Sequence, residues 1–363
     1  RAFGIHAIMG SQTLDGAYTL SRSTMGQMAV RIALQCSEQD SYIILNEDNA
    51  AARLLSRPGE AIYNDAAGNV EGNSPFQVVW LNDKEREVYL EDLTRRDKGK
   101  VREMVVYEGN QPVYLRDNTA YKDTSNDTKP VAAKIWLGGA MAIKEDTFAT
   151  IRPASASNVL IVGQQDETTT GMIASTLASL QAQYNKNDAT FTLLDGTPAD
   201  SSHAGMLKKS TSAMECSVTN VGVREVEGAM ATMHAELQRR MKGSAVNAPD
   251  QFLIINAMHR YRDLRRNEDD YGFSMNDEEK AKTPAQVLAE LLKEGPTLGM
   301  HTIITTDTLA NLNRALDRQS IREFDMRVLL QMGGNDSTNL IDMPDASKLG
   351  MHRALLYSEE TGT

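Results

Sequence analysis

The clearest chemical pattern in the sequence lies where an apolar run meets a helical one. The run NVLIVG ends at Gly163, the segment QQDETTT follows, and a helical stretch begins at Gly171. This order is typical of a phosphate-binding loop, GxxxxGK[ST], whose glycines expose backbone N–H groups, whose lysine neutralises phosphate and whose hydroxyl holds magnesium. Counted from Gly163, Thr168 stands at the second glycine, Thr169 at the lysine and Thr170 at the hydroxyl position. Only the last keeps its chemical type.

Two further features argue against hydrolysis at this site. Asp166 and Glu167 add negative charge where a triphosphate would bring more, and Coulomb repulsion opposes that approach. An acidic pair should end a neighbouring apolar strand, one residue for the magnesium shell and one to activate water. The matching run QFLIIN instead leads to Asn256 and Ala257, neither of which can act as a base. We therefore expect a nucleotide fold that has lost hydrolysis, with no catalytic residue and no metal ligand set.

Strands and helices alternate through the second part of the chain. Helical patterns cover residues 171–184, 225–242 and 284–295, the last with Thr283 as N-cap and Pro284 at its first position. Short apolar runs between them predict buried parallel strands at residues 158–163, 190–194, 252–255, 301–305, 326–332 and 353–357. The expected fold is α/β, a mostly parallel sheet flanked by helices.

The beginning of the chain repeats its end. FGIHAIMGSQTL (residues 3–14) reappears as LGMHTIITTDTL (298–309), and VRIALQCSEQDSYIILN (30–46) as MRVLLQMGGNDSTNLID (326–342). His6 and His301, Arg31 and Arg327, and Tyr63 and Tyr357 are separated by 294 to 296 residues. One unit of about that length occurs twice, and the first copy opens at its final third.

The repeat predicts three parts. Residues 1–75 are the C-terminal part of a first, truncated domain that ends in a loop at 65–75. Residues 76–130 are a linker, with a strand at 76–81 and an exposed helix over 85–104. Residues 131–363 are a second domain.

The two copies resemble the motor domain of the FtsK/SpoIIIE branch of the FtsK-HerA ATPases. The match rests on GIHAIMGSQTL, VRIALQCSEQDSYIILNEDNAAARLL and PGEAIYN in the first copy, GMHTIITTDTL, MRVLLQMGGNDSTNLIDMPDASKLG and HRALLYS in the second, and WLGGAMAIKEDT before the degenerate loop. The resemblance implies a RecA-like P-loop NTPase fold and a hexameric ring that pulls double-stranded DNA. ATP and Mg²⁺ are then cofactors of the parent protein, and none is assigned to this chain.

The two copies match the site residues of the family to different degrees. In the first copy an apolar strand is followed by Ser11 and Gln12, the polar pair that reaches toward the γ-phosphate in the family. The second copy has Thr306 and Asp307 there, and an acid repels phosphate. Arg31 and Arg327 could reach a neighbouring subunit's phosphate or pair with a local acid, and we favour the local pairing.

Family members place a loop facing the DNA channel after the acidic strand. Here that position holds four arginines that could contact a phosphate backbone. The alternative is a solvated helix end neutralised by the acids at 268–270. The four arginines are Arg260, Arg262, Arg265 and Arg266.

Composition narrows the class of protein. A net charge of −11 argues against a wholly basic surface, yet a ring needs positive charge only in its channel. Two cysteines cannot form a disulfide framework, and no apolar run reaches the length of a membrane span, so we expect a cytoplasmic protein. We interpret the second domain as a ring-building or regulatory module of a DNA translocase. The alternative is a non-catalytic platform that binds a protein segment, as in the related type VII secretion ATPases.

Overall fold

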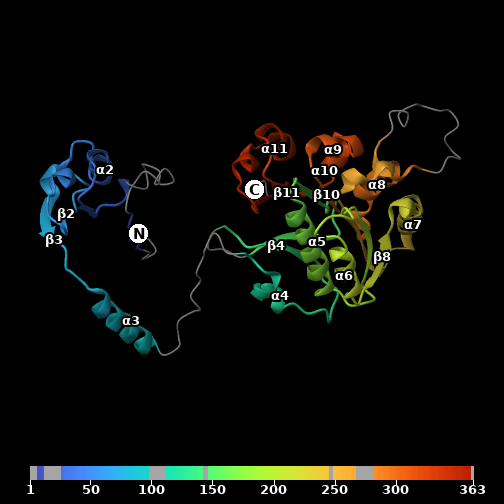
Figure 1. The fold of residues 1–363 in the computed structure, drawn as a ribbon, viewed down its shortest axis with the longest axis horizontal. Helices are drawn as coiled ribbons and strands as arrows, with labels where there is room; N and C mark the ends of the chain where they lie inside the picture. The colour runs from blue at the N-terminus through green and yellow to red at the C-terminus, as the bar shows by residue number, and fades with distance from the viewer. Residues whose placement is uncertain are drawn as a thin grey trace. The chain divides into compact units, whose positions relative to one another are not determined.

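The computed structural model describes residues 6–11, 26–97, 112–141, 146–244, 248–266 and 282–360. The chain divides into two compact units, unit 1 (Arg1–Met104) and unit 2 (Val105–Thr363) (Figure 1). Unit 2 takes in residues 112–130, where the sequence predicts a linker. Lys129 forms a 2.7 Å ion pair with Asp250, and the ring of Tyr121 meets that of Trp136 edge-on at 5.7 Å. These contacts attach the segment to unit 2.

Unit 1 is a small antiparallel sheet with one covered face. Its strands, in the order β1-β2-β3, are β1 (Arg31–Leu34), β2 (Glu60–Asn64) and β3 (Asn73–Gln77). The remaining elements are α2 (Glu38–Ile44), η2 (Ala51–Leu54), η3 (Val70–Gly72) and α3 (Asp83–Asp97). Ala33, Leu45, Ala52 and Ile62 form its core. As predicted for an exposed helix, α3 buries no residue.

Two predictions for unit 1 are wrong. β3 lies at Asn73–Gln77, partly inside the expected loop at 65–75, and residues 78–81 are not in a strand. Amide hydrogen bonds from Asn64 and Asn49 to Asn73 Oδ1 (2.9 and 3.0 Å) fix the turn that brings β3 back, and this long-range contact leaves no local pattern. The expected strand at the start of the chain is irregular over residues 6–11. No other described segment pairs with it, and a strand needs such pairing.

Unit 2 is built on a seven-stranded sheet. Its order is β12-β11-β6-β10-β9-β7-β8, and all pairs are parallel except β11 with β12. The strands are β6 (Val159–Val162), β7 (Ala189–Asp195), β8 (Ser217–Val221), β9 (Asp250–Asn256), β10 (Met300–Thr306), β11 (Met326–Leu330) and β12 (Ala354–Ser358). Six of these were predicted. The expected parallel direction of β12 is wrong, because the chain after α11 returns to the C-terminal end of β11, where the N–H of Met332 donates to the carbonyl of Ala346, and β12 starts from that end. β8 was missed because its pattern is mostly exposed.

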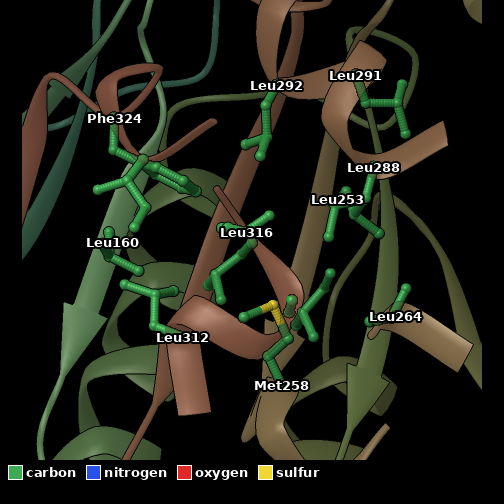
Figure 2. Close-up of a cluster of buried hydrophobic side chains, with 14 of the residues drawn as sticks. Leu160, Leu253, Met258, Leu264, Leu288, Leu291, Leu292, Leu312, Leu316 and Phe324 are labelled. Carbon is green, nitrogen blue, oxygen red and sulfur yellow. The ribbon is translucent and has the colours of Figure 1, made fainter. Parts of the chain in front are cut away.

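Helices cover both faces of this sheet (Figure 1). One face packs on α5 (Asp166–Gln181), α6 (Met206–Ser212) and the hairpin of β4 (Ala133–Gly138) and β5 (Thr147–Ile151). The other packs on α7 (Val226–Arg239), α8 (Pro284–Glu294), α9 (Leu309–Ala315), α10 (Arg318–Arg322) and α11 (Gly334–Ile341). Figure 2 shows leucines of α8 and α9 meeting Leu160 and Leu253 of the sheet. α8 begins with the predicted Thr283 cap, completed as a capping box by Gln286.

Short helical turns complete unit 2. They are η4 (Leu115–Asp117), α4 (Thr119–Lys122), η5 (Val223–Glu225), η6 (Arg240–Ser244), η7 (Met258–Arg260), η8 (Arg262–Leu264), η10 (Pro296–Leu298) and η11 (Asp345–Lys348). In the described part of the chain, no helix combines the length and the apolar character that a membrane crossing needs.

The repeated segments adopt the same local structure. β1, α2, η2 and β2 recur in the same order as β11, α11, η11 and β12. Arg31 and Arg327 each donate from Nε to the carbonyl three residues before (3.1 Å in both) and from Nη1 to the carbonyl thirteen residues after (3.2 and 2.7 Å). Each arginine therefore ties the end of a helix to a strand. The sequence favoured pairing with a local acid, and Arg327 does pair with Glu359.

The alignment of Tyr63 with Tyr357 is one residue out of register. Leu34 pairs with Ala61 in unit 1, and Leu330, its counterpart, pairs with Ala354 in unit 2. Ala61 therefore corresponds to Ala354, and Tyr63 corresponds to Leu356. Gly59 and His352 then coincide, and both have a left-handed backbone (φ of 81° and 57°).

Candidate functional site

The segment in the place of a phosphate-binding loop is short. β6 ends at Val162 and α5 begins at Asp166, so only residues 163–165 lie between them. The sequence predicts the helix from Gly171, and its early start places Thr168, Thr169 and Thr170 inside its first turns. A wide loop of exposed N–H groups is therefore missing from this position.

Gly163 has a packing role. Its N–H donates to the carbonyl of Thr306 at 2.9 Å, which extends the pairing of β6 with β10. A Cβ at this position would lie 2.4 Å from Cβ of Leu330 on β11, closer than atoms can approach. The glycine is therefore needed for the close approach of two strands, and its N–H is already bonded within the sheet.

The three threonines face the protein. Thr169 is 6% exposed, and its hydroxyl donates to the carbonyls of Gln165 (3.3 Å) and Asp166 (3.2 Å). Thr170 is buried as well. Thr168 donates to Gln165 Oε1 at 3.1 Å and lies 3.2 Å from His352 Nδ1. Gln165 Oε1 also accepts from the N–H of His352 at 3.1 Å, so the turn before β12 is tied to the start of α5.

Acidic side chains occupy the positive end of α5. Asp166 and Glu167 are its first two residues, and carboxylates in the first turn are stabilised by the helix dipole. The same end of a helix attracts phosphate in nucleotide-binding proteins. Here the protein supplies its own negative charges, which oppose a triphosphate.

Asn256 is the centre of a buried network at the carboxyl end of β9. Its amide nitrogen donates to Asp195 Oδ1 (3.2 Å) and Thr197 Oγ1 (3.0 Å), and its oxygen accepts from Thr305 Oγ1 (2.9 Å). The Thr305 hydroxyl in turn accepts from the N–H of Ala257 at 2.7 Å. Asn256 is 3% exposed, so its amide is fully used in joining β7, β9 and β10. The residues do not fit a magnesium-bound triphosphate.

The comparisons with known proteins bear on the fold. No protein-family model matches the chain, and no curated protein sequence does. Among solved structures, the cytoplasmic domain of the Thermomonospora curvata Type VII Secretion ATPase EccC superposes with a TM-score of 0.53 at 15% identity, over 92% of this chain and 40% of that one. The chain therefore has the same fold as this ATPase domain, a RecA-like α/β fold with a mostly parallel sheet flanked by helices.

Two further solved structures match with lower TM-scores. The pCW3 conjugation coupling protein TcpA, a monomer form with ATPγS, has a TM-score of 0.45 at 12% identity, over 84% of each chain. EssC (ATPases 2 and 3) from Geobacillus thermodenitrificans has a TM-score of 0.44 at 12% identity, over 65% of this chain and 45% of that one. The chain spans less than half the length of the EccC and EssC structures.

Thr306 and Asp307 form the polar pair of unit 2, and Asp307 lies beside a histidine that was not predicted from the sequence. Asp307 Oδ1 lies 3.5 Å from His259 Nδ1, and Asp307 also accepts two bonds from Asn311 (2.9 and 3.0 Å). Burial lowers the pKa of His259, against the charge of Asp307. Burial by itself would raise the pKa of Asp307. The hydrogen bonds from Asn311 and the nearby His259 outweigh this effect and hold the pKa of the carboxyl below its usual value. Thr306 is 2% exposed, and its hydroxyl has no partner among the described residues.

Of two other missed residues, Asp195 and His352, only Asp195 had a signal in the sequence. Asp195 follows the apolar run TFTLL just as Asn256 follows FLII, and parallel strands end at one edge of a sheet. That rule would have placed Asp195 and Asn256 together. The contact of His352 with the start of α5 joins residues 187 apart in the sequence, and no local pattern predicts it.

The remaining predicted residues are dispersed. Ser11 is exposed in an irregular segment, and Gln12 lies outside the described residues. The four arginines after β9 are all exposed. Arg265 donates to the carbonyl of His259 at 3.1 Å, and Arg266 lies 3.9 Å from Asp317. The acids at 268–270 lie outside the described residues.

A pocket of about 940 Å³ lies beside α5. Its walls are α5, the β4–β5 hairpin, residues 112–115 and the start of β12. The lining is largely apolar and rich in methionine, with Glu167 and Thr168 at one side. Lining residues include Trp136, Met141, Gly171, Met172, Met351 and Ala354. This lining suits an apolar group better than a phosphate.

Proposed function

We propose that unit 2 is a non-hydrolysing module of an ATP-driven motor protein and that it builds or regulates a ring. The observation that carries this proposal is the network of Asn256, which commits the strand end of a nucleotide site to structure. The bonded N–H of Gly163 and the acids of α5 support it. ATP and Mg²⁺ then act in another motor domain of the parent protein, which we place in the cytoplasm.

We further propose that unit 1 is the C-terminal part of such a motor domain. Ile32 and Leu34 of β1 are each 53% exposed, whereas their counterparts Val328 and Leu330 are 1% and 0% exposed. In unit 2 that face is covered by α5, and β11 pairs with β6. The apolar face of β1 is suited to the same covering.

Phosphate release tests the loss of hydrolysis. The chain should show no magnesium-dependent ATP turnover, and Thr169→Lys should not create it, because Asp166 and Glu167 still oppose the triphosphate. The absence of a positioned base typically costs about 10² to 10⁴ in rate. Phosphate release by the wild type and by Thr169→Lys is compared with that of the triple variant Thr169→Lys, Asn256→Asp, Ala257→Glu. Turnover in the wild type that Thr170→Ala abolishes would show that the site works.

The substrate that we propose for the parent motor is double-stranded DNA. Its support is the group of exposed arginines after β9, which suits contacts with a phosphate backbone in the channel of a homo-oligomeric ring. Binding of duplex DNA at low salt tests this directly.

A second candidate function is a platform that binds a protein segment. The pocket beside α5 favours it, because its methionine-rich lining adapts to apolar side chains. The EccC structure is that of a secretion ATPase, which is compatible with this candidate. Capture of a peptide without DNA binding would favour the platform over the translocase.

A further inference from the structure

The two copies of the repeat differ at the outer edge of their last strand. In unit 1, β2 has a neighbour on each side, β1 and β3. In unit 2, the corresponding strand β12 pairs only with β11 within the described residues and ends the sheet. All five residues of β12 are partly exposed. The first copy therefore shows what the edge of the second can accept.

The backbone groups on that edge can be assigned from register. The N–H of Val78 donates to the carbonyl of Gly59 at 2.8 Å, and Pro75, which has no N–H, lies opposite Ile62. Bonded pairs alternate in an antiparallel ladder, so Ala61 and Tyr63 are the residues of β2 that bond to β3. Their counterparts in unit 2 are Ala354 and Leu356. Each directs its N–H and carbonyl away from β11.

Side chains on an added strand would meet the pocket. Phe76 of β3 lies opposite Ala61, and cross-strand partners share a face of the sheet. Ala354, the counterpart of Ala61, and Leu356 line the pocket beside α5. A large apolar side chain placed opposite Ala354 would therefore be directed to the pocket, next to Met351.

We propose that the outer edge of β12 binds an extended segment of another polypeptide as an antiparallel strand, with a large apolar residue opposite Ala354. Main-chain hydrogen bonds from Ala354 and Leu356 hold the segment, and the pocket selects its side chain. The inference rests on the second candidate function and names how the protein segment is held. It involves neither nucleotide nor DNA.

The probe is a fluorescent peptide with the sequence of residues 71–81, EGNSPFQVVWL, titrated into the intact chain. Methylating the backbone nitrogen of Phe76 should weaken binding about tenfold or more, since that N–H would donate to Ala354. Methylating Gln77, which falls at a non-bonded position, should change it little. These peptide changes leave the folding of the protein untouched.

Two protein variants separate the edge from the pocket. At Gly171, on α5, and Gly228, on α7, an added Cβ meets no atom within 4 Å. Gly171→Leu adds bulk to the pocket and should weaken binding about tenfold or more, whereas Gly228→Leu, on the far face of the sheet, is the matched control.

The outcomes distinguish strand pairing at the edge of β12 from binding in the pocket beside α5. Equal binding of both methylated peptides, or no binding of the parent peptide, would overturn edge pairing. If both methylated peptides bind equally but Gly171→Leu still weakens binding, the pocket beside α5 binds the peptide without strand pairing at β12. Sensitivity to Phe76 methylation with no effect of Gly171→Leu would support the edge and remove the pocket as the selector.

Discussion

Asn256 is the residue at which the proposed loss of hydrolysis coincides with a structural role. Its side chain donates twice and accepts once within a buried network, and Asp195 lies next to it. Asn256→Asp should therefore destabilise unit 2 by about 2–4 kcal/mol, because two donors are lost and two carboxylates meet in a buried site. Urea unfolding followed by the fluorescence of buried Trp136 measures the loss.

Asp195→Asn provides the control for that change. In the double variant the new amide at 195 can donate to the carboxylate at 256, so part of the lost stability should return. A coupling free energy of about 1–3 kcal/mol is expected for such neighbours. Full stability of Asn256→Asp alone, or a strictly additive loss in the double variant, would contradict the network as the reason for Asn256.

Single residues also mark the limit of what the sequence predicts. The missing lysine and acidic pair are visible as types at fixed spacings; in the structure Thr169 lies in the first turn of α5 and Asn256 at the end of β9. What Thr169, Asn256 and Gly163 do instead depends on partners from other strands, such as Thr305 and Leu330. Those contacts arise from sheet order, which the sequence did not specify.

At the scale of elements, the buried serines Ser41 and Ser337 close equivalent helix–strand connections. Ser41 Oγ donates to the carbonyl eight residues on (2.8 Å) and Ser337 Oγ to the carbonyl six residues on (2.5 Å). Each also accepts at 3.3 Å from an alanine N–H, that of Ala52 or Ala346. The connection differs by two residues in length, yet the hydroxyl has the same two bonds.

Ser41→Ala and Ser337→Ala should therefore have matched effects. Each removes a buried donor and acceptor, which should cost about 1–3 kcal/mol in its own unit. Hydrogen exchange at the Ala52 and Ala346 amides measures the loss of protection in each copy. Thr338→Ala, at an exposed position of α11, is the control. An effect in only one copy would show that the repeat has diverged in structure.

The helix α7 carries a pH-dependent contribution to stability. Hydrogen bonds from Arg239, and further ones from buried Arg240, lower the pKa of Glu236 to about 2 despite partial burial. A carboxyl group whose pKa is lowered by folding stabilises the folded state at pH values above its unfolded pKa of about 4.5. This stabilisation is lost as the pH falls toward 2. Glu236→Gln should therefore cost up to about 3 kcal/mol at pH 6 and much less near pH 2. A pH-independent cost, measured by urea unfolding, would contradict this.

Elements were easier to predict than their directions. β6, β9, β10 and β11 are continuous apolar runs, and burial on both faces of a sheet produces that pattern in any order. β12 has a similar run, but it is antiparallel because the connection through α11 and η11 ends beside the C-terminal end of β11, where it began. The sequence predicted a loop at 65–75 and a strand at 76–81, whereas β3 spans Asn73–Gln77 and contains Pro75. Its position depends on the hydrogen bond from Asn49 to Asn73, which joins residues far apart in the sequence.

At the scale of the whole molecule, charge sets the conditions for binding DNA. The chain carries a net charge of −11, so duplex DNA is repelled except where cations gather. If the arginines after β9 meet phosphates, binding should be detectable at low salt and should weaken steeply as salt rises. The slope of log K against log salt falls by about 0.9 for each lost phosphate contact.

Arg260→Ala and Arg262→Ala should each reduce that slope by about one, with similar losses for unrelated duplex sequences, because phosphate contacts carry no sequence information. Arg95→Ala and Arg96→Ala on the exposed helix α3 are the matched control, since they remove equal charge from another unit. Fluorescence anisotropy with a labelled duplex over a salt series measures all four variants. Equal losses from both pairs would indicate a general charge effect, and no binding at the lowest salt would leave the protein-binding platform as the function to pursue.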